Sequence, residues 1–305
     1  MKCDKILLCM SSLLRHFDVS VKSCVENIVL QLPNKPDFIG HFPKKSRNLE
    51  NLKAIDYLSN YVNIKKIHFE EDPPPASFSA EKFRKNANQV RESNKTMVGN
   101  FYQWYNMQKC SELKDAQETE NQTLYDMVIW ARPDLFYFNK LENVEQLENR
   151  FWLVGHDNHL CGLNDRFCIG SSSDMKKRMN ILTYFVNEWY PQYSEDVSIL
   201  FSGKNGIHKN KKPQWNPEIV YKTYIRQKLN LHTGKLNLCF GKMRSDTDAT
   251  IPYYFSEHGN DYTGFSCEED LVNTEVNSKL KKFVKSGSFS NGSSWGTVDV
   301  NNIKL

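Results

Sequence analysis

The chain has 305 residues, of which 39% are hydrophobic and 12% aromatic, enough to bury a sizeable core and to exclude global disorder. Its 40 basic and 36 acidic side chains give a net charge of only +4, which does not favour binding to nucleic acid or to an anionic membrane. The apolar run at residues 6–10 is too short for a membrane span or a signal peptide, so we expect a soluble, cytoplasmic protein.

The first part of the chain alternates strands with helices. Apolar runs predict strands at residues 5–10, 37–42 and 64–69, and apolar residues at helical spacing predict helices at residues 19–30 and 49–58. This alternation is typical of an α/β fold with a mostly parallel sheet that is flanked by helices on both faces.

Three consecutive prolines make residues 71–76 a rigid loop at the carboxyl end of the third strand. A long helix is expected over residues 79–113, with a break near Gly99 and with most of its aromatic side chains in the core.

The second half of the chain predicts more strands and two further helices. The strands are expected at residues 125–130, 135–138, 151–154, 166–169 and 236–240. Ser and Asp at residues 170–174 begin one helix, and Asn-Pro-Glu at residues 216–218 begins another. The periodicity weakens beyond Gly241, so we expect one domain over residues 1–240 and an irregular extension over residues 241–305 with a flexible Ser/Gly-rich tail.

The cysteines show no C-x-x-C pair and no cluster of the kind that metal sites need. Cys3, Cys9 and Cys24 lie in apolar patterns, which favours free buried thiols over a disulfide framework. The remaining cysteines are Cys110, Cys161, Cys168, Cys239 and Cys267.

Charged and polar residues follow several expected strands, where ligands bind in open α/β sheets. These candidates are Ser11, Ser12, Arg15, His41, Asp72, Arg132 and Asp134. The first loop lacks the glycine patterns of dinucleotide-binding folds and P-loops, which excludes dehydrogenase and ATPase functions. A phosphate could still bind the hydroxyl groups of Ser11 and Ser12 and the guanidinium of Arg15.

The strongest indication of a functional site is in residues 125–136, where an apolar strand is followed by Ala-Arg-Pro-Asp. It resembles the place where GT-A glycosyltransferases carry Asp-x-Asp, whose carboxylates hold a divalent cation against the donor diphosphate. Arg132 occupies the first acidic position and can supply positive charge itself. A site without metal and a site with Mn²⁺ or Mg²⁺ on Asp134 therefore both stay open.

Further segments extend this resemblance over residues 3–232. They are residues 15–17, 106–113, 125–136, 164–171 and 216–218. The chain resembles a family of polysaccharide and lipopolysaccharide glycosyltransferases of bacteria and large DNA viruses. A narrower resemblance, to chlorella-virus enzymes that build capsid glycans, implies a xylosyltransferase. Trp130 departs from the family, which often has arginine there.

The resemblance implies a GT-A-like domain that transfers a sugar from a nucleoside diphosphate sugar, with UDP as the nucleotide, to a glycan hydroxyl. The acceptor would be an oligosaccharide or glycoprotein, such as a viral capsid N-glycan or a surface polysaccharide. Arg15, Arg132 and Arg166 are the candidates for neutralising the diphosphate. In an inverting enzyme a carboxylate takes the proton of the acceptor hydroxyl, and Asp72, Asp165 and Glu218 are the candidates for this base; a retaining outcome stays open. His41, Tyr102, Gln103 and Asn164 complete the expected donor site.

Two other functions remain open at this point. A catalytically inactive carbohydrate-binding protein would bind the sugar without releasing nucleoside diphosphate. A sulfotransferase would need a phosphate loop after the first strand, and Ser-Ser-Leu-Leu-Arg at residues 11–15 is a poor version of such a loop.

Overall fold

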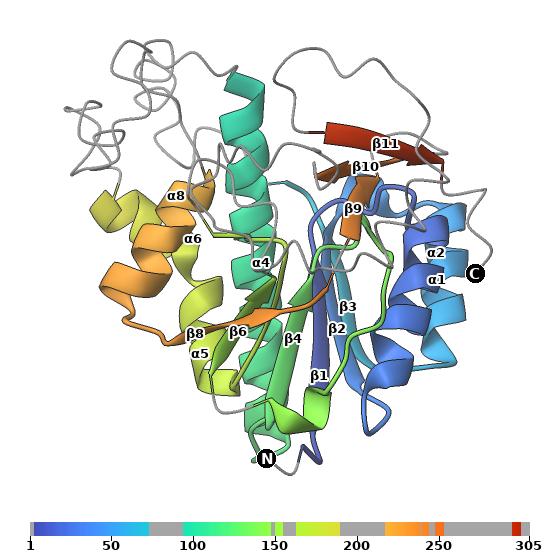
Figure 1. Cartoon of the computed structure of the whole chain (residues 1–305), viewed down its shortest axis with the longest axis horizontal. Helices are drawn as coiled ribbons and strands as arrows, with labels where there is room; N and C mark the ends of the chain where they lie inside the picture. Colours follow the sequence, from blue (N-terminus) through green and yellow to red (C-terminus); the bar gives the residue numbers. More distant parts are fainter. Residues whose placement is uncertain are drawn as a thin grey trace.

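The computed structural model describes residues 3–72, 94–147, 150–154, 163–189, 217–238, 240–243, 248–252 and 295–299. Within these residues the strands form a seven-stranded sheet and a four-stranded sheet (Figure 1). The prolines of the expected rigid loop and the first part of the expected long helix lie outside the described residues.

The seven-stranded sheet has the order β3-β2-β1-β4-β7-β6-β8. Its strands are β1 (Ile6–Ser11), β2 (Asp37–Pro43), β3 (Asn63–Glu70), β4 (Met127–Ala131), β6 (Phe151–Val154), β7 (Phe167–Gly170) and β8 (Thr233–Leu236). All neighbouring strands are parallel except β7, which is antiparallel to both β4 and β6. The predicted α/β class with a mostly parallel sheet is confirmed.

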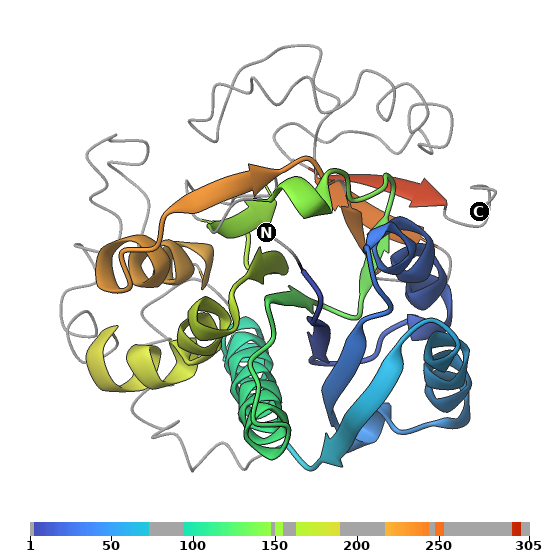
Figure 2. The ribbon, with the colours of Figure 1, turned by 90° about the horizontal axis from the view of Figure 1, so that it is seen from below.

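Helices cover both faces of this sheet. They are α1 (Phe17–Asn27), α2 (Leu49–Ser59), α4 (Asn94–Glu120), α5 (Ser172–Met179), α6 (Ile181–Tyr184) and α8 (Pro217–Lys222). Short 3₁₀ turns are η1 (Val29–Gln31), η2 (Lys44–Ser46) and η4 (Val144–Gln146), and π turns η6 (Phe185–Trp189) and η7 (Thr223–Lys228) extend α6 and α8. Helices α1 and α2 lie on one face and α4 on the other (Figure 2).

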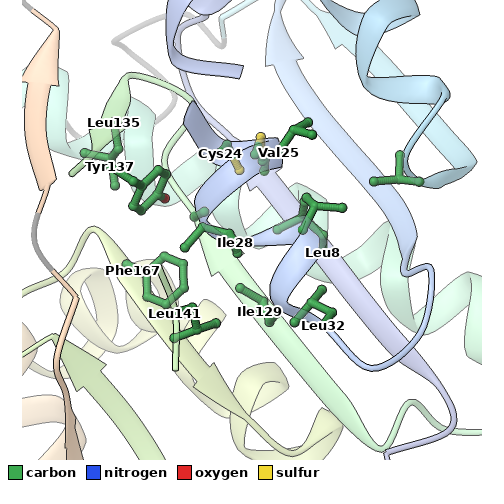
Figure 3. Close-up of a cluster of buried hydrophobic side chains, with 14 of the residues drawn as sticks. Leu8, Cys24, Val25, Ile28, Leu32, Ile129, Leu135, Tyr137, Leu141 and Phe167 are labelled. Carbon is green, nitrogen blue, oxygen red and sulfur yellow. The ribbon is translucent and has the colours of Figure 1, made fainter. Parts of the chain in front are cut away.

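Alternating side chains of the central strands supply two hydrophobic cores, because neighbouring residues of a strand point to opposite faces. Leu8 of β1 and Ile129 of β4 meet Cys24 of α1 and Ile28, which follows α1, on one face (Figure 3). On the other face, Cys9 belongs to the core that includes α4. The centre of the sheet is therefore buried on both sides.

The predicted break of the long helix near Gly99 is wrong. The helix runs without interruption through this glycine and continues to Glu120, beyond the expected end at residue 113. Glycine in a helix costs about 0.5–1 kcal/mol. The burial of Trp104 and Met107 against the sheet outweighs that cost.

The expected strand at residues 236–240 is also wrong, because it spans the ends of two strands in different sheets. Leu236 ends β8, and Phe240 begins β9 (Phe240–Met243). Strand β9 lies in the second sheet, of order β11-β10-β9-β5, with β5 (Leu135–Tyr137), β10 (Asp248–Pro252) and β11 (Trp295–Asp299).

The second sheet includes strands from both sides of the domain boundary expected at residue 240. Strand β9 crosses the boundary expected at residue 240, and β11 lies within the segment expected as a flexible tail. The division into residues 1–240 and residues 241–305 stays a prediction. No described helix has both the length and the apolar character that a membrane span requires.

The expectation of free buried thiols is confirmed for the described cysteines, which are Cys3, Cys9, Cys24, Cys110 and Cys168. Burial raises the pKa of Cys24 to about 12 and that of Cys168 to about 11, so both thiols are protonated at neutral pH. Cys161, Cys239 and Cys267 lie outside the described residues.

Candidate functional site

The strand order reverses between β1 and β4. The chain proceeds from β1 outward to β2 and β3, and then returns to place β4 on the other side of β1. In open α/β sheets, ligands bind beyond the carboxyl ends of the strands at such a reversal. Ser11 ends β1 at this point, and Arg132 follows β4 directly.

Residues 132–134 connect the two sheets, because β4 belongs to the first and β5 to the second. Pro133 cannot donate a ladder hydrogen bond, which ends β4. The Arg132 amide donates to the Arg166 carbonyl at 3.0 Å, and the Asp134 carbonyl accepts from the Met243 amide at 2.9 Å. The backbone is thus held on both sides of the proline.

Arg132 and Asp134 form a bidentate ion pair. Nε of Arg132 donates to Oδ1 of Asp134 at 2.9 Å, and Nη2 donates to Oδ2 at 2.6 Å. Their side chains are 14% and 3% exposed. Burial lowers the pKa of the Arg132 guanidinium, but the Asp134 carboxylate outweighs burial and holds this pKa above its ordinary value. Arg132 is therefore a permanent cation at the reversal point.

Further polar side chains extend this pair into a larger group. Gln103 of α4 accepts from Arg132 Nη1 at 3.0 Å and donates to Asp165 Oδ2 at 3.2 Å. Arg166 Nη2 donates to Glu218 of α8 at 2.8 Å, and these two side chains are 4% and 6% exposed. We call this group the charge cluster; it comprises Gln103, Arg132, Asp134, Asp165, Arg166 and Glu218.

The charge cluster contains one carboxylate more than it has guanidinium groups. Asp134 and Glu218 are each hydrogen-bonded to an arginine, whereas Asp165 accepts an amide hydrogen from Gln103 and lies 4.0 Å from Arg166 Nε. Asp165 is thus the member least engaged by a guanidinium.

Asn164 and Ser11 hold neighbouring parts of the chain in place beside the charge cluster. Asn164 is buried, and its Oδ1 accepts from the Arg166 amide at 2.9 Å, which shapes the turn before β7. The Ser11 hydroxyl is fully buried and accepts from the Trp130 indole at 3.1 Å. The tryptophan that departs from the family pattern therefore anchors the end of β1.

Sequence reasoning missed Arg178, which is almost fully buried on α5. Its Nη2 donates to the Asp165 carbonyl at 2.9 Å, and its Nε donates to the Tyr221 hydroxyl at 3.0 Å. Its guanidinium lies 3.9 Å from the centre of the Trp130 ring. Arg178 thus positions the backbone of Asp165. The sequence did contain a signal for this residue: Arg178 lies on the same face of α5 as Met175 and Met179, so its burial was predictable.

Other candidates are not members of the charge cluster. Asp72 accepts from Lys45 at 2.6 Å, and the Lys45 ammonium lies 6.0 Å from the centre of the Tyr102 ring. Arg15 is exposed after β1, and Ser12 has a positive φ of 104°, a conformation that is strained for serine. The roles expected for these residues stay predictions.

His41 takes part in a second group, which sequence reasoning found only in part. Its Nδ1 lies 3.0 Å from Oδ1 of Asn106, and its Nε2 lies 2.9 Å from Oε2 of Glu70. Burial lowers the pKa of His41, although Glu70 and Asn106 act in the opposite direction. His41, His68 and Glu70 each offer a ligand atom within 4.8 Å of the others, and we call them the histidine cluster.

The signal for the rest of the histidine cluster was present in the chain. His68 and Glu70 stand two residues apart on β3 and therefore share one face of that strand. Among the described residues, the histidine cluster brings together three potential metal ligands. Asp134, the metal ligand expected from the sequence, is not one of its members.

Residues 1–189, more than half of the chain, match the family described as a domain of unknown function (DUF7796). The chain belongs to this family. No curated protein gives a significant match.

Several solved structures of glycosyltransferases overlap this chain at low similarity. Mouse xyloside xylosyltransferase 1 in its apo form has 9% identity and a TM-score of 0.42, with 76% of this chain and 84% of that chain covered. The PaToxG glycosyltransferase has 10% identity and a TM-score of 0.34, with coverages of 75% and 70%. The galactosyltransferase LgtC, in complex with donor and acceptor sugar analogs, has 13% identity and a TM-score of 0.37, with coverages of 62% and 65%. Similarity at this level is too low to assign an activity.

Proposed function

We propose that this protein is a glycosyltransferase that transfers a sugar from a nucleoside diphosphate sugar to a hydroxyl group of a glycan acceptor. The observation that carries the proposal is the buried Arg132–Asp134 pair directly after β4, at the reversal of strand order. The resemblance of residues 125–136 to glycosyltransferases predicts that the donor diphosphate binds at the same position.

The proposed role of Arg132 is to neutralise the leaving diphosphate. A guanidinium binds phosphate oxygens through two parallel N–H groups, the same geometry that Arg132 now offers to Asp134. A phosphate can therefore take over these donors if Asp134 rotates away. Arg166, which is held by Glu218, supplies the second fixed positive charge of the charge cluster.

Asp165 is the base that the geometry supports best. It lies in the charge cluster, and Gln103 and the backbone contact with Arg178 hold it in place. We propose that Asp165 accepts the proton of the acceptor hydroxyl as this oxygen attacks the anomeric carbon and the bond to the diphosphate breaks. Glu218 is engaged by Arg166, and Asp72 by Lys45, so both are weaker candidates.

The donor set around Asp134 does not fit a divalent cation. Both of its carboxylate oxygens accept hydrogen bonds from Arg132, whose positive charge would repel a metal ion. Hard cations such as Mn²⁺ or Mg²⁺ prefer several oxygen ligands around one point. We therefore propose that the donor diphosphate binds Arg132 and needs no metal ion on Asp134.

The finer identity of the reaction rests on the sequence resemblance. It supports UDP as the nucleotide, xylose as the sugar and a capsid N-glycan or surface polysaccharide as the acceptor. A viral origin and a cytoplasmic location belong to the same proposal.

The alternative is a carbohydrate-binding protein without turnover. The engagement of Asp134 and Glu218 by arginines favours it, because neither carboxylate can act as a base while its ion pair persists. Release of nucleoside diphosphate from a sugar donor separates the two functions.

The test is a binding and turnover screen of UDP, GDP, CDP and their sugars, with EDTA and with Mn²⁺. We expect one diphosphate to raise the melting temperature in EDTA, and we expect Arg132→Ala to abolish that shift. Arg226→Ala, at an exposed arginine outside the site, is the matched control. Asp165→Asn should retain donor binding and lose turnover by about 10²–10⁴-fold. Donor affinity unchanged in a folded Arg132→Ala variant would contradict the proposal.

A further inference from the structure

The histidine cluster is built by the register of two parallel strands. His41 of β2 and His68 of β3 are direct partners in the strand pairing, and their rings stack with centres 5.3 Å apart. Glu70 lies two residues beyond His68 and therefore points to the same face. Three potential metal ligands thus gather at the carboxyl ends of neighbouring strands.

Hydrogen bonds determine which nitrogen of His41 carries hydrogen. Nδ2 of Asn106 donates to the Tyr102 carbonyl at 2.7 Å, which turns Oδ1 of Asn106 toward His41. Because an amide oxygen can only accept, Nδ1 of His41 must donate to it. In the neutral ring Nε2 then presents a lone pair, and this lone pair faces a carboxylate oxygen of Glu70 at 2.9 Å. Two acceptors at this distance repel each other unless a proton or a metal ion lies between them, and a metal ion can take the place of the proton.

We infer that His41, His68 and Glu70 form a binding site for a divalent transition-metal ion of the zinc class. Two imidazoles and one carboxylate are a ligand set that suits zinc, whereas magnesium and calcium prefer oxygen ligands. Nitrogen and oxygen ligands at about 2.0–2.2 Å from a tetrahedral zinc ion lie about 3.3–3.5 Å apart. His41 Nε2 and Glu70 Oε2 lie 2.9 Å apart, so a separation larger by about 0.5 Å would accommodate the ion. His68 is exposed and can rotate to complete the set.

The surroundings of the ligands support this inference. Metal-bound histidines usually donate their second ring N–H to an oxygen that fixes the tautomer, as Asn106 does for His41. The Tyr105 hydroxyl donates to the other carboxylate oxygen of Glu70 at 3.3 Å. Both of these supporting residues come from α4, which packs across β2.

Exposure gives the ion a path from solvent. His41 is 2% exposed, but the Glu70 side chain is 38% exposed and His68 is exposed as well. Three protein ligands leave a coordination position open for water or for an anionic oxygen on this side. The histidine cluster shares no residue with the charge cluster, and the expected binding of Zn²⁺ does not depend on the proposed glycosyltransferase activity.

The test is calorimetry of the full chain, after chelation and dialysis, with Zn²⁺, Co²⁺ and Mg²⁺. We expect one Zn²⁺ ion per chain, no comparable binding of Mg²⁺, and a visible Co²⁺ spectrum without thiolate bands. His68→Ala and Glu70→Gln, both at solvent-accessible side chains, should each weaken Zn²⁺ binding by more than about 100-fold. Asn106→Leu should weaken it by about 10–100-fold.

His232→Ala is the matched control, because His232 is exposed and outside both clusters. It should leave the affinity for Zn²⁺ unchanged, and thermal unfolding checks that every variant is folded. Absence of Zn²⁺ binding would overturn the inference. Binding that persists in both His68→Ala and Glu70→Gln, or a Co²⁺ spectrum with thiolate bands, would also overturn it, because the ligands would then be other residues.

Discussion

At the scale of single residues, the site depends on ionised side chains that are buried in pairs. Removing two charges from water costs several kcal/mol per ion, and mutual attraction repays this only when the geometry is good. Arg166 and Glu218 meet at 2.8 Å with almost no exposure, so each charge offsets part of the cost of burying the other.

We predict that Arg166→Leu lowers the free energy of unfolding by about 3–5 kcal/mol, because the buried carboxylate of Glu218 then loses the guanidinium that lies 2.8 Å away. Replacing both residues by leucine should recover most of this loss. Urea unfolding of the two variants measures the difference. A double variant that is no more stable than Arg166→Leu would show that the ion pair is not the origin of the effect.

At the scale of elements, α4 serves both clusters. Gln103 reaches the charge cluster, whereas Tyr105 and Asn106 reach the histidine cluster, so neighbouring residues on one helix orient two groups of ligands. The rigidity of this helix therefore matters to both sites. Gly99, in its first turns, is the position where the helix is intrinsically weakest.

We predict that Gly99→Ala raises the free energy of unfolding by about 0.5–1 kcal/mol, because alanine loses less backbone entropy on folding. Gly99 is exposed, and an added Cβ would meet no atom within 4 Å. Gly40→Ala is the contrasting variant, since its Cβ would lie 2.5 Å from the buried Phe42 ring. It should destabilise the chain by about 1–3 kcal/mol. Equal effects of the two changes in urea unfolding would contradict this prediction.

At the scale of the whole molecule, the two sheets share one fold. Strand β9 pairs with β5, which follows β4 directly, and Phe240 of β9 is buried in the core that α1 covers. Met243 packs with Phe136 of β5. Strand β9 therefore joins residues on both sides of the boundary expected at residue 240, and that boundary stays a prediction.

We predict that a chain shortened to residues 1–252 folds cooperatively, whereas a chain shortened to residues 1–239 is insoluble or unfolded. The shorter chain lacks Phe240 and Met243, and each buried side chain of this size contributes about 2–5 kcal/mol. Their combined loss is similar to the total stability of a domain. Thermal unfolding followed by circular dichroism compares the two chains, and equal melting temperatures would contradict the prediction, because β9 would then add nothing to the stability of the fold.

Most elements were predictable from the sequence, because hydrophobic periodicity is a local property. The strands at residues 37–42 and 151–154 and the helix at residues 49–58 agree with β2, β6 and α2. The failures occur where local signals compete with packing, as at Gly99, or where the chain changes sheets, as between Leu236 and Phe240.

The sequence by itself determined the α/β class and the presence of polar residues such as His41, Arg132 and Asp134 at the carboxyl ends of strands. Only the tertiary structure decided which of them meet. Asp165 joins Gln103, Glu218 joins Arg166, and His41 lies beside His68, although these partners are 27–62 residues apart. Such partners depend on strand register and helix packing, which arise from contacts between distant segments and leave no periodic pattern in the chain.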